Sequence, residues 1–123
     1  MDRKKILLVD DSSTVLLMER MILSKNDYDV VTARDGVEGV EKARSEHPDL
    51  ILMDVVMPRM DGFEAVRQLR QEEETREIPV IMVTTRGELS SVENGYASGC
   101  NEYVTKPING LELLAKVRSC LGQ

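Results

Sequence analysis

The sequence predicts an α/β fold in which a parallel five-stranded sheet lies between two layers of helices. Short apolar runs alternate with helix-like stretches along the whole chain, without a linker or a low-complexity segment. Three of the runs are apolar throughout, as in central parallel strands that are buried on both faces. Alternating strands and helices of this kind build a three-layer sandwich with right-handed crossovers.

Five strands are expected, and their composition separates centre from edge. The central strands are the uninterrupted apolar runs at residues 6–9, 50–53 and 80–83. The run at 28–33 is more polar and the run at 102–104 is short, so both suit the edges of the sheet.

Five helices are expected between these strands, at about residues 12–25, 36–46, 61–71, 88–98 and 109–121. Ser12 or Ser13 can cap the first helix and Asp61 the third, where Glu64 completes a capping box. The helix at 88–98 is the weakest, because it contains two serines, an asparagine and Gly95.

Helical spacing also predicts which faces are buried. In the first helix the apolar stripe comprises Val15, Met18 and Ile22, with Leu17 and Met21 beside it. In the last helix we expect an inward-facing stripe of Leu111, Leu114, Val117 and Leu121.

Bulk composition limits the classes of function. The chain has 123 residues, enough for one domain, and a net charge of −6, which argues against a nucleic-acid-binding face. No apolar run approaches the roughly 20 residues of a membrane span, and the apolar stretch after the charged start is too short for a secretory signal. The two cysteines are expected to be reduced thiols of a cytoplasmic protein.

The candidate site consists of polar residues that follow the apolar runs, namely Asp10, Asp11, Asp54, Thr84 and Lys106. Parallel strands would bring them together at the carboxyl edge of the sheet. Clustered carboxylates repel one another and need a cation, and Mg²⁺ prefers such oxygen ligands. One carboxylate can instead attack phosphorus and form an aspartyl phosphate, with the lysine and the hydroxyl neutralising phosphoryl oxygens. The fifth run ends in Arg34-Asp35-Gly36, which suggests no obvious chemistry.

The order of these site residues along the chain resembles that of the receiver domain of two-component response regulators. The resemblance is strongest to the stand-alone, chemotaxis-type receivers. The resemblance covers the whole chain, so we expect one receiver domain at residues 1–123, complete from Met1 to its last helix. The matching stretches are residues 6–12 (ILLVDDS), 48–58 (PDLILMDVVMP), 60–62 (MDG), 83–85 (VTT) and 103–107 (YVTKP). The resemblance implies a doubly wound, flavodoxin-like sheet of strand order 2-1-3-4-5.

The resemblance also implies a role for each matching residue. Asp54 would accept the phosphoryl group from a histidine kinase, in contact with Lys106 and Thr84. Mg²⁺ would be bound directly by Asp11, Asp54 and the Val56 carbonyl, and through water by Asp10. Tyr103 would be the aromatic switch that turns inward when Thr84 moves, and the Lys106–Pro107 bond would be cis.

Three further positions differ among receivers and would tune this one. Val56 cannot orient a water by hydrogen bonding, and Arg86 could attract or shield the phosphoryl group. The aspartyl phosphate is therefore expected to hydrolyse slowly. The bulk of Thr85 could hinder the inward swing of Tyr103.

As a receiver, the protein would be a phosphorelay component without independent substrate turnover. Its expected partners are a sensor histidine kinase or phosphotransfer protein and a downstream target, bound through the fourth helix, last strand and last helix. We expect a cytoplasmic monomer that binds neither nucleic acid nor membrane.

Two alternatives stay open at this point. Phosphatases of the haloacid dehalogenase type also form an aspartyl phosphate, but they need an Asp-x-Asp motif, which neither Asp10-Asp11-Ser12 nor Asp54-Val55-Val56 provides. A degenerate receiver would serve only as an interaction module, and the intact set of Asp11, Asp54, Thr84 and Lys106 argues against it.

Overall fold

The computed structural model describes residues 3–85 and 99–123. Its strands are β1 (Lys5–Val9), β2 (Asp29–Ala33), β3 (Leu50–Asp54), β4 (Val80–Thr84) and β5 (Glu102–Thr105). Its helices are α1 (Ser13–Ser24), α2 (Gly36–Glu46), α3 (Gly62–Gln71) and α5 (Gly110–Leu121). The helix expected at 88–98 lies outside the described residues.

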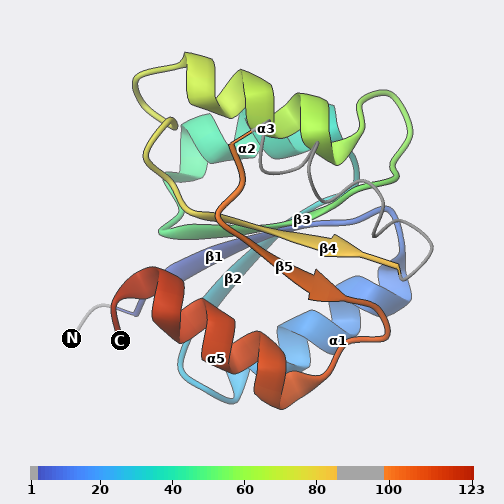
Figure 1. Cartoon of the computed structure of the whole chain (residues 1–123), viewed down its shortest axis with the longest axis vertical. Coiled ribbons are helices and arrows are strands. Elements are labelled where there is room, and N and C mark those ends of the chain that lie inside the picture. The colour runs from blue at the N-terminus through green and yellow to red at the C-terminus, as the bar shows by residue number, and fades with distance from the viewer. Residues whose placement is uncertain (1–2, 86–98) are drawn as a thin grey trace.

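All strand pairs are parallel, and the sheet has the order β2-β1-β3-β4-β5. Helices α1 and α5 cover one face, and α2 and α3 cover the other (Figure 1). The predicted order, the three layers and the two edge strands are thereby confirmed. Every residue of β3 and β4 is buried, as expected of strands between two helical layers.

Side-chain caps start the four described helices. The capping residues accept a backbone N–H from the first turn, and they are Ser12, Asp35, Asp61 and Asn109. Three of these helices, α1, α2 and α3, therefore begin close to the carboxyl ends of β1, β2 and β3. The β1–α1 and β2–α2 connections at this edge are short, residues 10–12 and 34–35, and the β3–α3 connection comprises residues 55–61.

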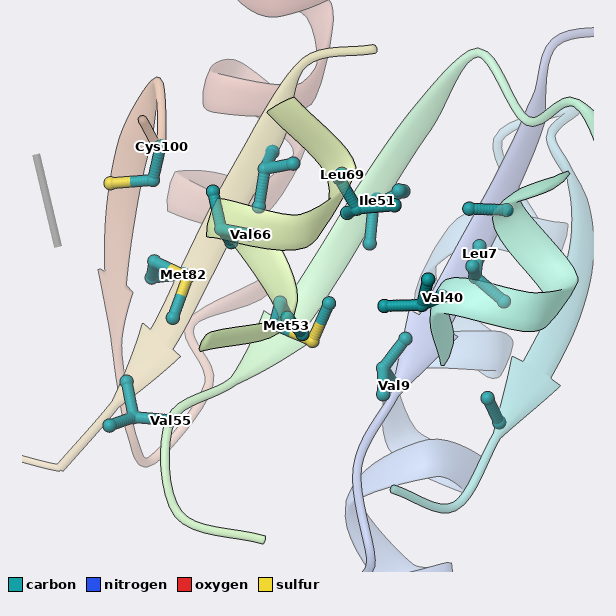
Figure 2. Close-up of a cluster of buried hydrophobic side chains, with 14 of the residues drawn as sticks. Leu7, Val9, Val40, Ile51, Met53, Val55, Val66, Leu69, Met82 and Cys100 are labelled. Atoms are coloured by element: carbon teal, nitrogen blue, oxygen red, sulfur yellow. The ribbon is translucent and has the colours of Figure 1, made fainter. Parts of the chain in front are cut away.

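The sheet divides the apolar interior into two clusters. One cluster lies between the sheet and the α2–α3 layer and includes Leu7, Ile51, Met53, Val66 and Met82 (Figure 2). The other lies between the sheet and the α1–α5 layer, where alternate strand residues such as Ile6, Leu8 and Leu52 meet Leu16 and Leu113. The alternation follows from the period of two along a strand.

The predicted buried face of α1 is partly wrong, although Ile22 packs against the apolar interior and Val15 is half-buried as expected. Leu17, Met18 and Met21 are exposed, and the buried residues are Leu16, Glu19 and Leu23. The error has a physical cause, because the ionisable residue Glu19 occupies the centre of the buried face, so a search for apolar residues at helical spacing misses that face.

The predicted face of α5 is also partly wrong. Leu111 is 83% exposed, whereas Leu113 and Val117 are fully buried.

Cys100 and Cys120 are both free thiols, as predicted. Within residues 3–85 and 99–123, the structure contains no helix of sufficient length and apolar character to span a membrane.

Candidate functional site

The carboxyl edge of the sheet brings three aspartates together. Asp10 and Asp11 follow β1, and Asp54 ends the neighbouring strand β3. One carboxylate oxygen from each of the three lies within 4.8 Å of the others. Asp10 and Asp54 are buried, whereas Asp11 is exposed, so the cluster opens to solvent on the side of Asp11.

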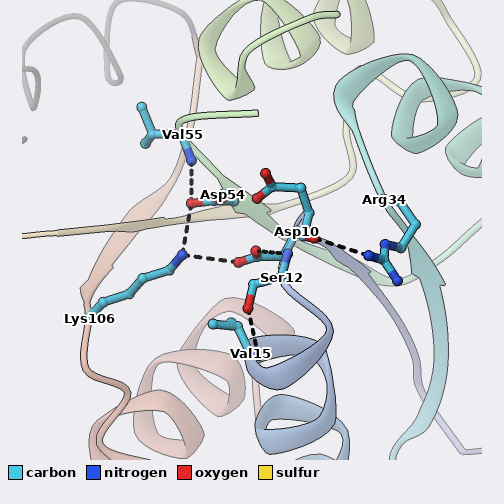
Figure 3. A network of polar contacts seen from close by, with 8 residues as sticks. Asp10, Ser12, Val15, Arg34, Asp54, Val55 and Lys106 are labelled. Atoms are coloured by element: carbon cyan, nitrogen blue, oxygen red, sulfur yellow. Dashed lines mark hydrogen bonds and ion pairs between the residues drawn. The ribbon is translucent and has the colours of Figure 1, made fainter. Parts of the chain in front are cut away.

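Lys106 reaches into this cluster from the end of β5. Its Nζ donates a hydrogen bond to Asp54 Oδ1 at 3.1 Å and lies 3.2 Å from Asp10 Oδ2 (Figure 3). The Lys106 backbone N–H donates to the Thr84 carbonyl at 2.6 Å, which ties the ends of β4 and β5 together. The Lys106–Pro107 peptide bond is cis, as the resemblance implied.

Backbone donors orient the two buried carboxylates. The Ser12 N–H donates to Asp10 Oδ1 at 2.9 Å, and the Val55 N–H donates to Asp54 Oδ1 at 3.0 Å. Asp54 Oδ1 thus receives two hydrogen bonds, whereas Oδ2 makes no hydrogen bond or ion pair to any described residue. Asp10 Oδ2 is buried and has only the ion pair with Lys106 within the described part of the chain.

The electrostatics of the cluster favour an added cation. Burial, and next the charge of Asp10, raise the pKa of Asp54 to about 6, and Lys106 only partly opposes this. Burial alone would lower the pKa of Lys106, but the charges of Asp10 and Asp54 outweigh it and raise that pKa. The cluster thus holds three carboxyl groups, and the one ammonium that enters it contacts Asp10 and Asp54. A hard divalent cation such as Mg²⁺ fits this set of oxygen ligands.

The remaining predicted site residues surround the cluster. The Thr84 side chain is buried at the end of β4, and its hydroxyl donates to the Thr85 carbonyl at 3.3 Å. The Val56 side chain is 62% exposed in the loop after β3, two residues beyond Asp54. Tyr103 is buried in the cluster on the α2–α3 side of the sheet. Arg86 lies outside the described residues.

One residue near the site escaped the sequence analysis. Glu19 of α1 is only 2% exposed and has no hydrogen bond or ion pair with any described side chain. Burial first, and then the charges of Asp10 and Asp54, raise its pKa to about 8 against the opposing charge of Lys106. A signal was present in the sequence, because Glu19 stands between Leu16 and Leu23 at helical spacing.

Comparison with known proteins agrees with this geometry. The family model of the response regulator receiver domain matches residues 6–118. Protein PilH of Pseudomonas aeruginosa is 42% identical over 117 residues, which cover 95% of this chain and 97% of PilH. This match decides against the haloacid dehalogenase alternative.

Solved structures show the same fold. Chemotaxis protein CheY4 of Vibrio cholerae matches with a TM-score of 0.91 at 35% identity, over 98% of this chain and 100% of that one. The receiver domain of the sensor histidine kinase PA1611 of Pseudomonas aeruginosa matches with a TM-score of 0.91 at 31% identity, over 99% and 100% of the two chains. That structure has a magnesium ion coordinated in its active-site cleft. The chain therefore belongs to the response regulator receiver domain family of two-component signalling.

Proposed function

We propose that residues 1–123 form one phosphoacceptor receiver domain in which Asp54 accepts a phosphoryl group from a histidine kinase or phosphotransfer protein. The observation that carries the proposal is the asymmetric setting of the Asp54 carboxylate. Oδ1 is held by Lys106 and by the Val55 N–H, so Oδ2 is the oxygen left to attack phosphorus. The attack forms the Oδ2–P bond and breaks the P–N bond of the donor phosphohistidine, whose imidazole keeps the electron pair.

Lys106 and Thr84 would act on the transferred group. The Lys106 ammonium already contacts Asp54 and can neutralise charge on a phosphoryl oxygen attached there. Thr84 lies next to Lys106 through the backbone bond between β4 and β5, so its hydroxyl can donate to another phosphoryl oxygen. Positioning and charge neutralisation are most of what phosphoryl transfer needs from a protein.

Mg²⁺ would be held by Asp11, Asp54 and the Val56 carbonyl directly, and by Asp10 through water. The support is the approach of the three carboxylates within 4.8 Å and the excess of negative charge over the single ammonium. When bound, Mg²⁺ supplies positive charge that offsets the negative charge of the phosphoryl oxygens.

The signal would leave by protein contact, since the domain is a phosphoacceptor and not an enzyme with its own substrate. Thr84 and Tyr103 lie on the adjacent strands β4 and β5, so a movement of Thr84 would reach the β5 edge of the sheet through Tyr103, which packs on the α2–α3 face. The downstream target would bind a surface made of β5, α5 and the helix expected at residues 88–98. The domain would be a cytoplasmic monomer that binds neither nucleic acid nor membrane.

Intact mass after incubation with acetyl phosphate and Mg²⁺ tests the acceptor. The wild type should gain one phosphoryl mass, and Asp54→Asn should gain none. Asp61→Asn is a matched control, because Asn can still cap α3 and the same charge is removed from a nearby exposed position. Full labelling of Asp54→Asn would show that Asp54 is not the phosphoacceptor. A wild type that is not labelled would favour the alternative of a degenerate receiver that serves only as an interaction module.

A further inference from the structure

The turn between β2 and α2 contacts the loop that carries Asp11. Arg34 follows β2, and its guanidinium donates from Nη2 to the Asp11 carbonyl at 3.1 Å (Figure 3). Its Nη1 donates to Ser13 Oγ at 2.9 Å. These two bonds hold the β1–α1 loop on both sides of Ser12.

The next residue of the same turn contacts the loop that carries Val56. Asp35 Oδ2 accepts from Arg59 Nε at 2.9 Å and lies 2.8 Å from Arg59 Nη2. Arg59 stands in the β3–α3 loop, three residues after Val56, with a positive φ of 66°. Asp35 Oδ1 caps α2 by accepting the Glu38 N–H at 2.9 Å, so this carboxylate is fixed at both oxygens.

Backbone packing brings the same two segments together. A Cβ added at Gly36 would lie 2.5 Å from the Met60 carbonyl oxygen, so only glycine allows this approach of α2 to the β3–α3 loop. The turn itself is closed by the Arg34 N–H, which donates to Glu38 Oε1 at 2.6 Å. The β2–α2 turn therefore bridges the β1–α1 and β3–α3 loops.

We propose that Arg34, Asp35 and Arg59 are positioning residues for Mg²⁺ binding. They hold the β1–α1 loop, which carries Asp11, and the β3–α3 loop, which carries Val56, at a fixed distance from each other before the ion binds. This inference rests on the proposed function, which places one direct ligand on each of these loops. Mg²⁺ demands near-ideal octahedral geometry, so ligands from two separate loops bind it well only if the loops are already in place.

The sign of the expected effect separates positioning from simple electrostatics. Arg34 and Arg59 are cations close to a cation site, so their charge alone would weaken Mg²⁺ binding, and its removal would tighten binding. If the two arginines position the loops, their removal weakens binding instead. Arg20 is a suitable control, because it is exposed on α1 and lines the same groove as Arg34.

Isothermal titration with Mg²⁺ alone tests the inference without any phosphorylation. Arg34→Gln and Arg59→Gln should each bind Mg²⁺ about tenfold more weakly than the wild type, the lower end of the range for residues that orient metal ligands. Arg34→Lys should recover part of the loss, and Arg20→Gln should bind as the wild type does or slightly more tightly. Asp35→Asn, which keeps the α2 cap, should lose no further affinity when combined with Arg59→Gln.

Several outcomes would overturn the inference. The first is an Arg34→Gln or Arg59→Gln variant that binds Mg²⁺ as tightly as Arg20→Gln. The second is a lower urea midpoint of these variants without Mg²⁺, which would assign the bridge to folding. If the wild type itself binds no Mg²⁺, the metal site of the proposed function fails as well, and this result is distinct from the other two.

Discussion

Glu19→Gln should raise the free energy of unfolding, and by an amount that grows with pH. Glu19 is buried on α1 against the sheet, and burial together with Asp10 and Asp54 raises its pKa to about 8. Its ordinary value is 4.5. Between pH 4.5 and about pH 8 the folded protein keeps a proton on Glu19 that the unfolded chain releases, so the free energy of unfolding falls as pH rises. Gln keeps the shape of the side chain and removes the titration.

The magnitude follows from the length of the window. Each pH unit between the two pKa values costs about 1.4 kcal/mol of stability. From pH 4.5 to pH 7 the carboxyl therefore lowers the free energy of unfolding by about 3 kcal/mol. Below pH 4.5 the wild type and Glu19→Gln should be nearly equal in stability, and above pH 8 the gap between them should stop growing. A difference of 3 kcal/mol is a large share of the stability of a small domain.

Urea unfolding at several pH values between 4.5 and 8.5, without Mg²⁺, measures this difference. Glu41→Gln is the control, because Glu41 is exposed on α2 and the same charge is removed there. The control should differ from the wild type by less than about 0.5 kcal/mol at every pH. A gap between Glu19→Gln and the wild type that does not change with pH would refute the reasoning.

Three further predictions concern the site. Lys106→Met leaves Asp10 and Asp54 without their shared ammonium, so it should lower the free energy of unfolding by about 3 kcal/mol. Excess Mg²⁺ should restore part of this loss in thermal unfolding. Gly62→Ala should lower it by about 3 kcal/mol and weaken labelling by acetyl phosphate, because the added Cβ would collide with the Asp54 carbonyl oxygen; unchanged urea unfolding would contradict this. Val56→Asn should shorten the life of the phosphorylated state severalfold, since Asn can orient a water, while the stability stays within about 0.5 kcal/mol. A phosphorylated lifetime equal to that of the wild type would show that Val56 does not limit hydrolysis.

The sheet and the acidic cluster were predictable because both depend on local pattern. Continuous apolar runs identify the central strands, and polar residues directly after such runs must gather at one edge of a parallel sheet. The strand order came from the resemblance, and the observed order agrees with it.

Other features depend on contacts that a linear pattern does not contain. The buried face of α1 was misassigned because Glu19 sits at its centre, where tertiary packing overrides the polarity of one side chain. The bonds from Arg34 to Asp11 and from Asp35 to Arg59 join three different loops. The second bond comes from Arg59, whose left-handed backbone its residue type does not suggest.

The division of the interior by the sheet has a consequence for how this sequence can vary. Leu52 and Met53 are neighbours in β3, yet they belong to different apolar clusters and share no packing partners across the sheet. The cost of truncating each side chain should therefore depend on a separate set of packed neighbours. Substitutions in one helical layer can be compensated on the face of the sheet that it covers. Partner-binding surfaces on the two sides can therefore change independently of each other. At the carboxyl edge, residues that follow or end β1, β3 and β5 meet, so substitutions there act on both halves at once.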